Sequence, residues 1–185
     1  IMYRKKIDDL IKWKNSNTRK PLILRGARQV GKTWLMKEFG KNYYEKCAYI
    51  NFDDNSRMEE LFSGDFDIDR IIQGLKIESN VNIEPENTLI IFDEVQETPK
   101  ALTALKYFYE KANQYHIIAA GSLLGVAMHE GTSFPVGKVD FLDLYPLSFY
   151  EFLQALGEEQ LVELIQKNDF QLITVFADKL KQYLK

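Results

Sequence analysis

The stretch Leu24-Arg-Gly-Ala-Arg-Gln-Val-Gly-Lys-Thr-Trp-Leu35 decides the fold of this 185-residue chain. It follows the apolar run Pro21–Leu24 and carries the spacing G-x-x-x-x-G-K-[ST]. Glycines at these positions let the backbone turn tightly, so that its N–H groups point inward toward a phosphate. The helix that follows adds the positive end of its dipole. The sequence therefore predicts a strand, a phosphate-binding loop and a helix, in that order.

The loop residues have expected parts in holding a nucleotide. The ammonium of Lys32 would reach the β- and γ-phosphates, and the hydroxyl of Thr33 would bind Mg²⁺. A plain turn that happens to carry glycines is the alternative, and the strand and helix on either side argue against it. The predicted nucleotide-binding residues are Gly26, Ala27, Arg28, Gln29, Val30, Gly31, Lys32 and Thr33.

A pair of acidic residues, Asp93 and Glu94, follows the apolar run Leu89–Phe92. A carboxylate at the C-terminal end of a buried parallel strand lies in the crevice where ligands bind in such sheets. We expect Asp93 to hold Mg²⁺, directly or through water. We expect Glu94 to act as the general base for the water that attacks the γ-phosphate. The alternative is a solvated strand end, against which the loop upstream argues.

Two further polar residues lie near the ends of later strands. Ser122 closely follows the run His116–Ala120, which should lie between the first and third strands. Its hydroxyl could then contact the γ-phosphate or the attacking water, although Gly-Ser is also a common strand-to-loop turn. Lys138 could donate to a phosphate, in the same chain or across an interface, or could be solvated.

Apolar runs and helical patterns alternate through most of the chain. Strands are predicted over residues 22–25, 47–52, 88–92, 116–120 and 138–144. Helices are predicted over residues 4–14, over 32–39 with Gly40 as the stop, twice within 56–78, and after Thr98-Pro99 with Leu102, Leu105, Phe108 and Ala112 buried. Strands that alternate with helices indicate an α/β fold with a parallel, doubly wound sheet.

The pattern changes near Pro146. Ser148 and Glu151 have the spacing of a capping box that opens a helix. The chain reads as helical from there on, with an apolar stripe made of Leu161, Leu164, Ile165, Ile173, Phe176, Leu180 and Leu184. We expect an α/β domain over residues 1–146 and a helical segment over 147–185, the start of a lid or C-terminal region.

Composition limits the classes of function. A net charge of −3 predicts no overall field that attracts nucleic acid, although basic residues within 4–20 could form a local contact or a solvated helix face. The single cysteine, Cys47, excludes an intrachain disulfide and is expected in the core.

No run approaches the ~20 apolar residues of a membrane span. We therefore expect a cytoplasmic protein with no membrane partner. His116 and His129 have no partners at metal-ligand spacing.

With these residues assembled, the chain resembles bacterial and archaeal ATPases of the AAA+ superfamily that carry a C-terminal domain of unknown function. The resemblance covers about residues 1–155. The matching motifs are Leu24–Thr33, Phe92-Asp-Glu-Val-Gln96, Ala120-Gly-Ser122, Phe134-Pro-Val-Gly-Lys-Val139 and Tyr145–Leu153. The resemblance implies a P-loop NTPase fold with a five-stranded sheet in the order 5-1-4-3-2, flanked by helices, and ATP with Mg²⁺ as ligands.

The same resemblance implies nucleotide roles at specific positions. These roles fall on Gly31, Lys32, Thr33, Asp93 and Glu94, and also on Ser122. Gln96 matches the family motif at Phe92–Gln96, but the resemblance implies no defined role for it. Relatives often carry Arg where this chain has Lys138. Family members are typically about twice as long as this sequence, so the chain resembles an N-terminal fragment.

Arginines are unevenly distributed, and none of the residues after Arg70 is an arginine. An arginine that completes a phosphoryl-transfer site would be sought after the fourth strand. Arg28, Arg57 and Arg70 belong to no motif of that kind. We expect the missing arginine to come from a partner in a homo-oligomer or from a C-terminal domain, or a lysine to replace it. This chain alone should then hydrolyse ATP slowly.

These observations favour an ATPase that converts ATP to ADP and phosphate with Mg²⁺ and drives a conformational change in a larger protein. The alternative is a nucleotide-gated module that binds protein or DNA and hydrolyses negligibly. A GTPase is less favoured because the chain contains no Asn-Lys-x-Asp word. A small-molecule kinase is less favoured because a Glu directly after Asp93 suits water activation.

Overall fold

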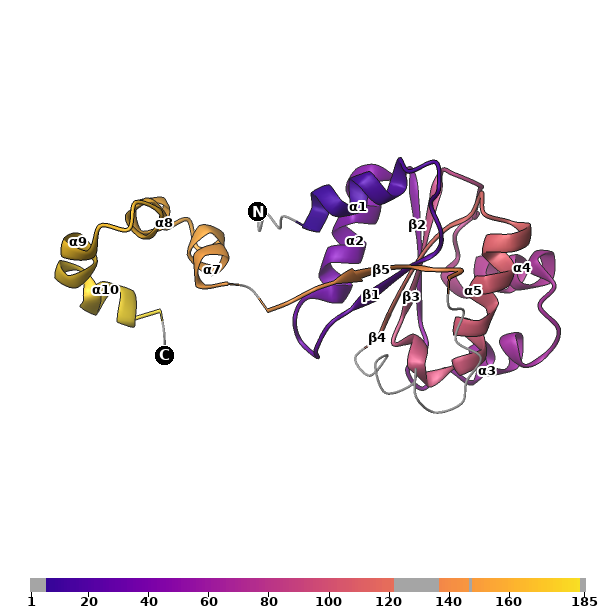
Figure 1. Cartoon of the computed structure of the whole chain (residues 1–185). Helices are drawn as coiled ribbons and strands as arrows, with labels where there is room; N and C mark the ends of the chain where they lie inside the picture. The colour runs from indigo at the N-terminus through magenta and orange to yellow at the C-terminus, as the bar shows by residue number, and fades with distance from the viewer. Residues whose placement is uncertain (1–5, 122–136, 147, 184–185) are drawn as a thin grey trace. The chain divides into compact units, whose positions relative to one another are not determined.

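The computed structural model describes residues 6–121, 137–146 and 148–183 of the chain (Figure 1). Ser122 and His129 therefore lie outside the described residues. The described chain divides into two compact units, one over Lys6–Tyr145 and one from Pro146 onward. The first unit carries the sheet and the loop.

The core of the first unit is a five-stranded parallel sheet with the strand order β2-β3-β4-β1-β5. Its strands are β1 (Leu22–Arg25), β2 (Lys46–Asn51), β3 (Thr88–Asp93), β4 (His116–Gly121) and β5 (Asp140–Asp143). Read from the other edge, this is the expected order 5-1-4-3-2, so the α/β fold and the strand order are confirmed. Every residue of β3 and β4 is buried, which explains their uninterrupted apolar character.

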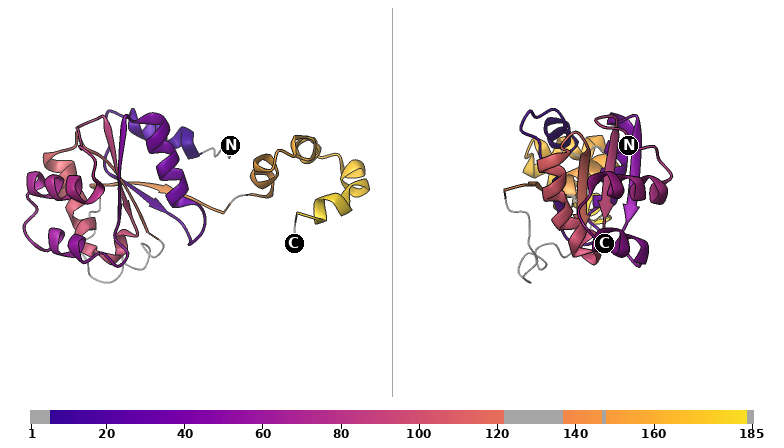
Figure 2. Two further views of the ribbon diagram at one scale, coloured as in Figure 1. Left: turned by 180° about the vertical axis from the view of Figure 1, so that it is seen from behind. Right: turned by 90° about the vertical axis from the view of Figure 1, so that its right-hand side faces the viewer.

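Helices cover both faces of this sheet. Helices α1 (Lys6–Lys14) and α2 (Lys32–Tyr43) lie on one face, while α3 (Ser56–Ser63), α4 (Ile68–Ser79) and α5 (Pro99–Lys111) lie on the other, as Figures 1 and 2 show from opposite sides. Two apolar clusters fill the layers: one joins α2 to the sheet through Leu35, Met36 and Phe39. The other joins α3, α4 and α5 to the opposite face of the sheet.

The prediction that α2 ends at Gly40 is wrong. The helix continues through Gly40 to Tyr43, and Gly40 is buried. A Cβ built on Gly40 would lie 2.6 Å from Sγ of Cys47 in β2, so the glycine is there for close packing of helix on sheet. Cys47 is accordingly packed against the core, as expected of it.

The start of α5 follows the predicted pattern only in part. Pro99 occupies the first turn, and Leu102, Leu105, Phe108 and Ala112 are buried as predicted. Thr98 precedes the helix, but its side chain makes no capping hydrogen bond. A 3-10 turn, η1 (Val95–Glu97), fills the short path from β3 to this helix.

The second unit consists of short helices. They are α7 (Phe149–Ala155), α8 (Glu159–Gln166), α9 (Phe170–Val175) and α10 (Ala177–Lys181). Ser148 and Glu151 form the predicted capping box at the start of α7. A small core contains Leu153, Leu161, Val162 and Leu180, whereas Phe176 of the predicted stripe is 45% exposed and Leu184 lies outside the described residues. Within the described parts of the chain, no helix is both long and apolar enough to cross a membrane.

Candidate phosphate-binding site

The loop between β1 and α2 folds tightly against the end of β5. Gly31 precedes α2 in the left-handed region at φ 85°, and Gln29 shares that region at φ 61°. A Cβ on Gly26 would lie 2.4 Å from the carbonyl oxygen of Leu144. The first glycine thus allows a close backbone approach, and the second allows the turn into the helix.

Lys32, in the first turn of α2, points back into the loop. Its Nζ donates to the carbonyl oxygens of Gly26 at 2.8 Å and Ala27 at 2.6 Å. The residue is 7% exposed. Burial lowers the pKa of Lys32 below its ordinary value, while the carboxylates of Glu94 and Asp93 oppose that shift. The ammonium therefore lies within the loop, at the place where phosphate oxygens would need a cation.

Thr33 and Asp93 are joined by a hydrogen bond that links the start of α2 to the end of β3. The hydroxyl of Thr33 donates to Oδ2 of Asp93 at 2.7 Å, and the hydroxyl of Tyr49 donates to the same oxygen at 2.9 Å. Asp93 is 3% exposed. Because Tyr49 is half-buried and bonded to a carboxylate, its pKa is raised above the ordinary value.

The oxygen groups of Thr33 and Asp93 fit Mg²⁺, which prefers hard oxygen ligands and usually takes one or two of them from the protein. The remaining positions of such an ion are filled by water and substrate phosphates. No group of three or more His, Cys, Asp or Glu side chains that could hold a metal ion is found among the described residues.

Glu94 sits at a sharp turn directly after β3. Its backbone lies in the left-handed region at φ 52°, which is uncommon for a residue with a side chain. Its N–H donates to Oδ1 of Asp93 at 3.1 Å, and its Oε2 accepts from Nε2 of Gln96 at 2.6 Å. The turn therefore points Glu94 away from the strand, and Gln96 holds its carboxylate.

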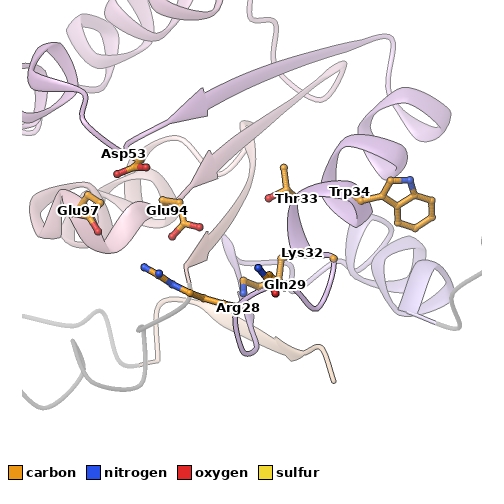
Figure 3. Close-up of a pocket in the computed structure, with 9 residues that line it drawn as sticks. Arg28, Gln29, Lys32, Thr33, Trp34, Asp53, Glu94 and Glu97 are labelled. Carbon is orange, nitrogen blue, oxygen red and sulfur yellow. The ribbon is translucent and has the colours of Figure 1, made fainter. Parts of the chain in front are cut away.

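A cavity of about 570 Å³ joins these groups (Figure 3). Figure 3 shows Thr33 and Glu94 on opposite sides of it, with Trp34 directed away from Glu94. Of the predicted nucleotide-binding residues, Arg28, Gln29, Gly31, Lys32 and Thr33 line the cavity, and Gly26 and Ala27 contribute the carbonyls behind Lys32. Glu94 also lines it, and the Asp93 carboxylate lies directly behind Thr33. Val30 is instead buried in the core.

Some residues near the cavity were not singled out by the sequence. Asp53, which follows β2, and Glu97 line the cavity. Tyr49 reaches Asp93 because β2 pairs with β3, so the strand order was the signal that could have identified it. Lys138 forms an ion pair with Glu110 at 3.1 Å and does not line this cavity.

The fold is similar to those of several solved ATPase-like structures. They are the Walker-type ATPase of Pyrococcus abyssi (TM-score 0.55, 18% identity), the ORC2 protein of Aeropyrum pernix in ADPNP-ADP complexes (0.57, 16%) and Drosophila ORC bound to DNA (0.53, 16%). The matches cover 86%, 86% and 92% of this chain but 59%, 52% and 55% of those structures. The chain thus spans little more than half the length of each.

The comparison of sequences gives one family and no individual relative. No curated protein sequence matches the chain. A family model described as "AAA domain" matches residues 18–153, which include the loop, β3 with Asp93 and Glu94, and all of β5. The chain therefore belongs to the AAA domain family of P-loop ATPases.

Proposed function

We propose that this protein is an Mg²⁺-dependent ATPase that transfers the γ-phosphoryl group of ATP to water. The observation that carries the proposal is the convergence of Lys32, Thr33 and Glu94 on one cavity. A cation, a hydroxyl and a carboxylate there match the needs of phosphate binding, metal binding and water activation.

Each residue has a proposed part in the reaction. Lys32 exchanges the carbonyls of Gly26 and Ala27 for oxygens of the β- and γ-phosphates. Thr33 and Asp93 hold Mg²⁺, which neutralises phosphate charge when it is bound. Glu94 accepts a proton from the attacking water, whose oxygen bonds to the γ-phosphorus as the bond to ADP breaks. Ser122, which follows β4 in the sequence, is proposed to contact the γ-phosphate or that water.

The decisive experiment compares Glu94→Gln with the unchanged chain. The amide is nearly isosteric but cannot take the proton, so hydrolysis should fall by about 100-fold or more while ATP binding stays within a few-fold. Phosphate release and the binding of a fluorescent ATP analogue are the two measurements. Lys32→Ala is the matched control, because it should weaken binding itself. Undiminished phosphate release by Glu94→Gln would remove Glu94 as the base.

A second function is favoured by one observation, the 2.6 Å hydrogen bond from Gln96 to Glu94. A carboxylate engaged in this way is not directed at a water, which suits a nucleotide-gated module whose hydrolysis starts only when a partner is bound. The similarity to Drosophila ORC bound to DNA makes DNA a reasonable partner to test. Phosphate release with and without duplex DNA separates the two functions, since a constitutive ATPase should not respond.

The proposed setting is a larger cytoplasmic assembly. The matches cover only 59% and 52% of two solved structures with a similar fold, so coupling of ATP hydrolysis to movement would involve further residues or copies of the chain. We therefore include a homo-oligomer, or a further C-terminal domain, in the proposal. Sedimentation of the chain with and without ATP tests the first of these.

A further inference from the structure

We propose that Arg28 is a catalytic arginine that the phosphate loop itself supplies to the terminal phosphate. The inference rests on the proposed ATPase function and assigns a residue role within it. It assigns the arginine that completes a phosphoryl-transfer site, for which the sequence offers no candidate after Arg70.

The position of Arg28 in the cavity is the first argument. Arg28 lies in the middle of the loop, between the glycines at 26 and 31, and its side chain lines the 570 Å³ cavity. Figure 3 shows the side chain leaving the loop on the side of Glu94 and Glu97, not on the side of Trp34. The guanidinium therefore extends toward the acidic end of the cavity.

The direction of a bound phosphate chain is the second argument. Lys32 and Thr33 define where the β- and γ-phosphates bind, and Glu94 marks where the attacking water must stand. The γ-phosphate consequently lies between the loop and Glu94. Because the Arg28 side chain extends to this same end, its guanidinium is placed beside the group in transfer.

The charge of the cavity is the third argument. Among the residues that the structure describes, its lining includes three carboxylates, Asp53, Glu94 and Glu97, and two cations, Arg28 and Lys32. The buried carboxylate of Asp93 lies directly behind. A triphosphate brings further negative charge into this field, so losing one of two cations would be costly. Mg²⁺ offsets part of this charge, and Arg28 is the cation at the end where negative charge develops.

The other arginines of the described chain are held elsewhere. Arg19 is buried and bonds to the carbonyl of Asn113, and Arg25 pairs with Asp143 at 2.8 Å. Arg57 pairs with Glu78 at 2.8 Å, and Arg70 pairs with Asp65 at 3.1 Å. None of these four lines the cavity. Arg28 is therefore the arginine of the described residues that is placed to act there.

Arginine has the right chemistry for this role. In phosphoryl transfer, negative charge spreads over the γ-phosphate and the bridging oxygen as the bond to ADP breaks. A guanidinium can donate two parallel hydrogen bonds to such oxygens, which an ammonium cannot do. Arg28 keeps all its protons, Glu94 takes the proton of the water, and the electron pair of the broken bond stays on ADP. Contacts that strengthen in the transition state raise kcat.

The test compares Arg28→Ala, Arg28→Lys and, as the matched control, Arg57→Ala, which removes an arginine far from the loop in the sequence and outside the cavity. Arg28→Ala should lower kcat by about 10²- to 10³-fold while the Kd for Mg²⁺-ADP changes less than about threefold. Arg28→Lys should recover only part of the loss, because a lysine restores the positive charge but not the two parallel N–H donors of a guanidinium. Arg57→Ala should keep kcat.

A second readout does not depend on turnover. ADP with aluminium fluoride mimics the phosphoryl group in transfer, so the unchanged chain should trap radiolabelled ADP in its presence and Arg28→Ala should not. Specific activity should also stay constant on dilution of the chain, because the arginine acts within one copy. A specific activity that falls on dilution would assign the arginine to a partner and overturn the proposal.

The outcomes separate this inference from the proposed function. If the unchanged chain hydrolyses ATP and Arg28→Ala does so equally, the role of Arg28 is wrong while the ATPase stands. Full rescue by Arg28→Lys would mean that Arg28 acts only as a general positive charge. Parallel losses of kcat and ADP binding in Arg28→Ala would mean the same, and either result would overturn the proposed catalytic role. If the unchanged chain neither hydrolyses ATP nor traps ADP with aluminium fluoride, both proposals fail.

Discussion

At the scale of single residues, Gly26 shows how closely the loop is built against its surroundings. A Cβ at this position would lie 2.4 Å from the carbonyl oxygen of Leu144, and this oxygen belongs to backbone that β1 also holds through a 2.7 Å hydrogen bond. A Cβ here would therefore force backbone that this hydrogen bond holds to shift. The first glycine of the loop is therefore required for packing as well as for the turn.

We predict that Gly26→Ala lowers the free energy of unfolding by about 2 kcal/mol because it overpacks this contact. Urea unfolding followed by circular dichroism measures the change. Gly64→Ala is the control, since its nearest neighbour is the flexible end of Arg70 at 3.3 Å. Equal stability of the two variants would show that the loop can move away from Leu144.

Tyr49 supports a second prediction at this scale. Its hydroxyl donates to Oδ2 of Asp93 at 2.9 Å, the same oxygen that accepts from Thr33. Tyr49→Phe leaves Asp93 with one fewer positioning bond, and the Mg²⁺ concentration for half-maximal phosphate release should rise by about 10-fold. Cys47→Ala, a change on the same strand without that hydroxyl, should leave it unaltered. An unchanged Mg²⁺ requirement in Tyr49→Phe would separate Tyr49 from metal binding.

The sequence predicted the residues of the candidate site better than the side chains that hydrogen-bond to them. Lys32, Thr33, Asp93 and Glu94 were identified because each belongs to a local pattern: a loop of fixed spacing or the end of an apolar strand. The partners Tyr49 and Gln96 depend on strand register and on the turn after β3, and neither property is written in a short motif. The direction of the Arg28 side chain is tertiary information of the same kind.

At the scale of elements, α2 and β2 are fitted to one another through Gly40. Helix propensity alone would favour alanine over glycine there by about 1 kcal/mol. Local sequence pattern therefore predicts a helix stop at this glycine, because the facing strand is not part of that pattern. In the structure, the place of the missing Cβ lies 2.6 Å from Sγ of Cys47.

We therefore predict that Gly40→Ala destabilises the protein by about 1–3 kcal/mol despite its better helix propensity. Adding Cys47→Ala removes the sulfur and should recover a large part of that loss. Thermal unfolding of the two single variants and the double variant forms the cycle that measures this coupling. Additive effects of the two substitutions would contradict the close contact between helix and strand.

At the scale of the whole molecule, one buried histidine makes stability depend on pH. His116 begins β4, is 7% exposed, and shares a 2.7 Å hydrogen bond with the hydroxyl of Tyr44. Burial lowers its pKa from 6.5 to about 4, and the positive charges of Arg19 and Lys14 act in the same direction. Between these two values the unfolded chain binds more protons than the folded one.

The sign of the effect follows from this difference. Stability is fully present above pH 6.5 and is lost as the pH falls through 6.5 toward 4, because protonation favours the unfolded chain. The urea midpoint should therefore drop more between about pH 7.5 and pH 5 in the unchanged chain than in His116→Asn. Equal drops in the two proteins would mean that other groups, not His116, govern the acid response.

The position of the loop could be expected from the sequence, because its spacing is a local pattern, and the strand order could be expected from the family resemblance. The alternation of strands and helices by itself indicates only a parallel, doubly wound sheet. The sequence pattern defines less well which apolar side chains of the second unit are buried. Phe176, which completes an apolar stripe in the sequence, is 45% exposed in the structure. Helical spacing shows which residues can share a face, but not which faces find a partner.

The bonds from Lys32 to the carbonyls of Gly26 and Ala27 change what a lysine substitution measures. The lysine holds the loop together before any phosphate arrives, so replacing it alters the reference state as well as the complex. Part of the affinity lost in Lys32→Ala would reflect a loosened starting conformation. Faster amide hydrogen exchange across residues 26–30 without nucleotide would reveal that part separately.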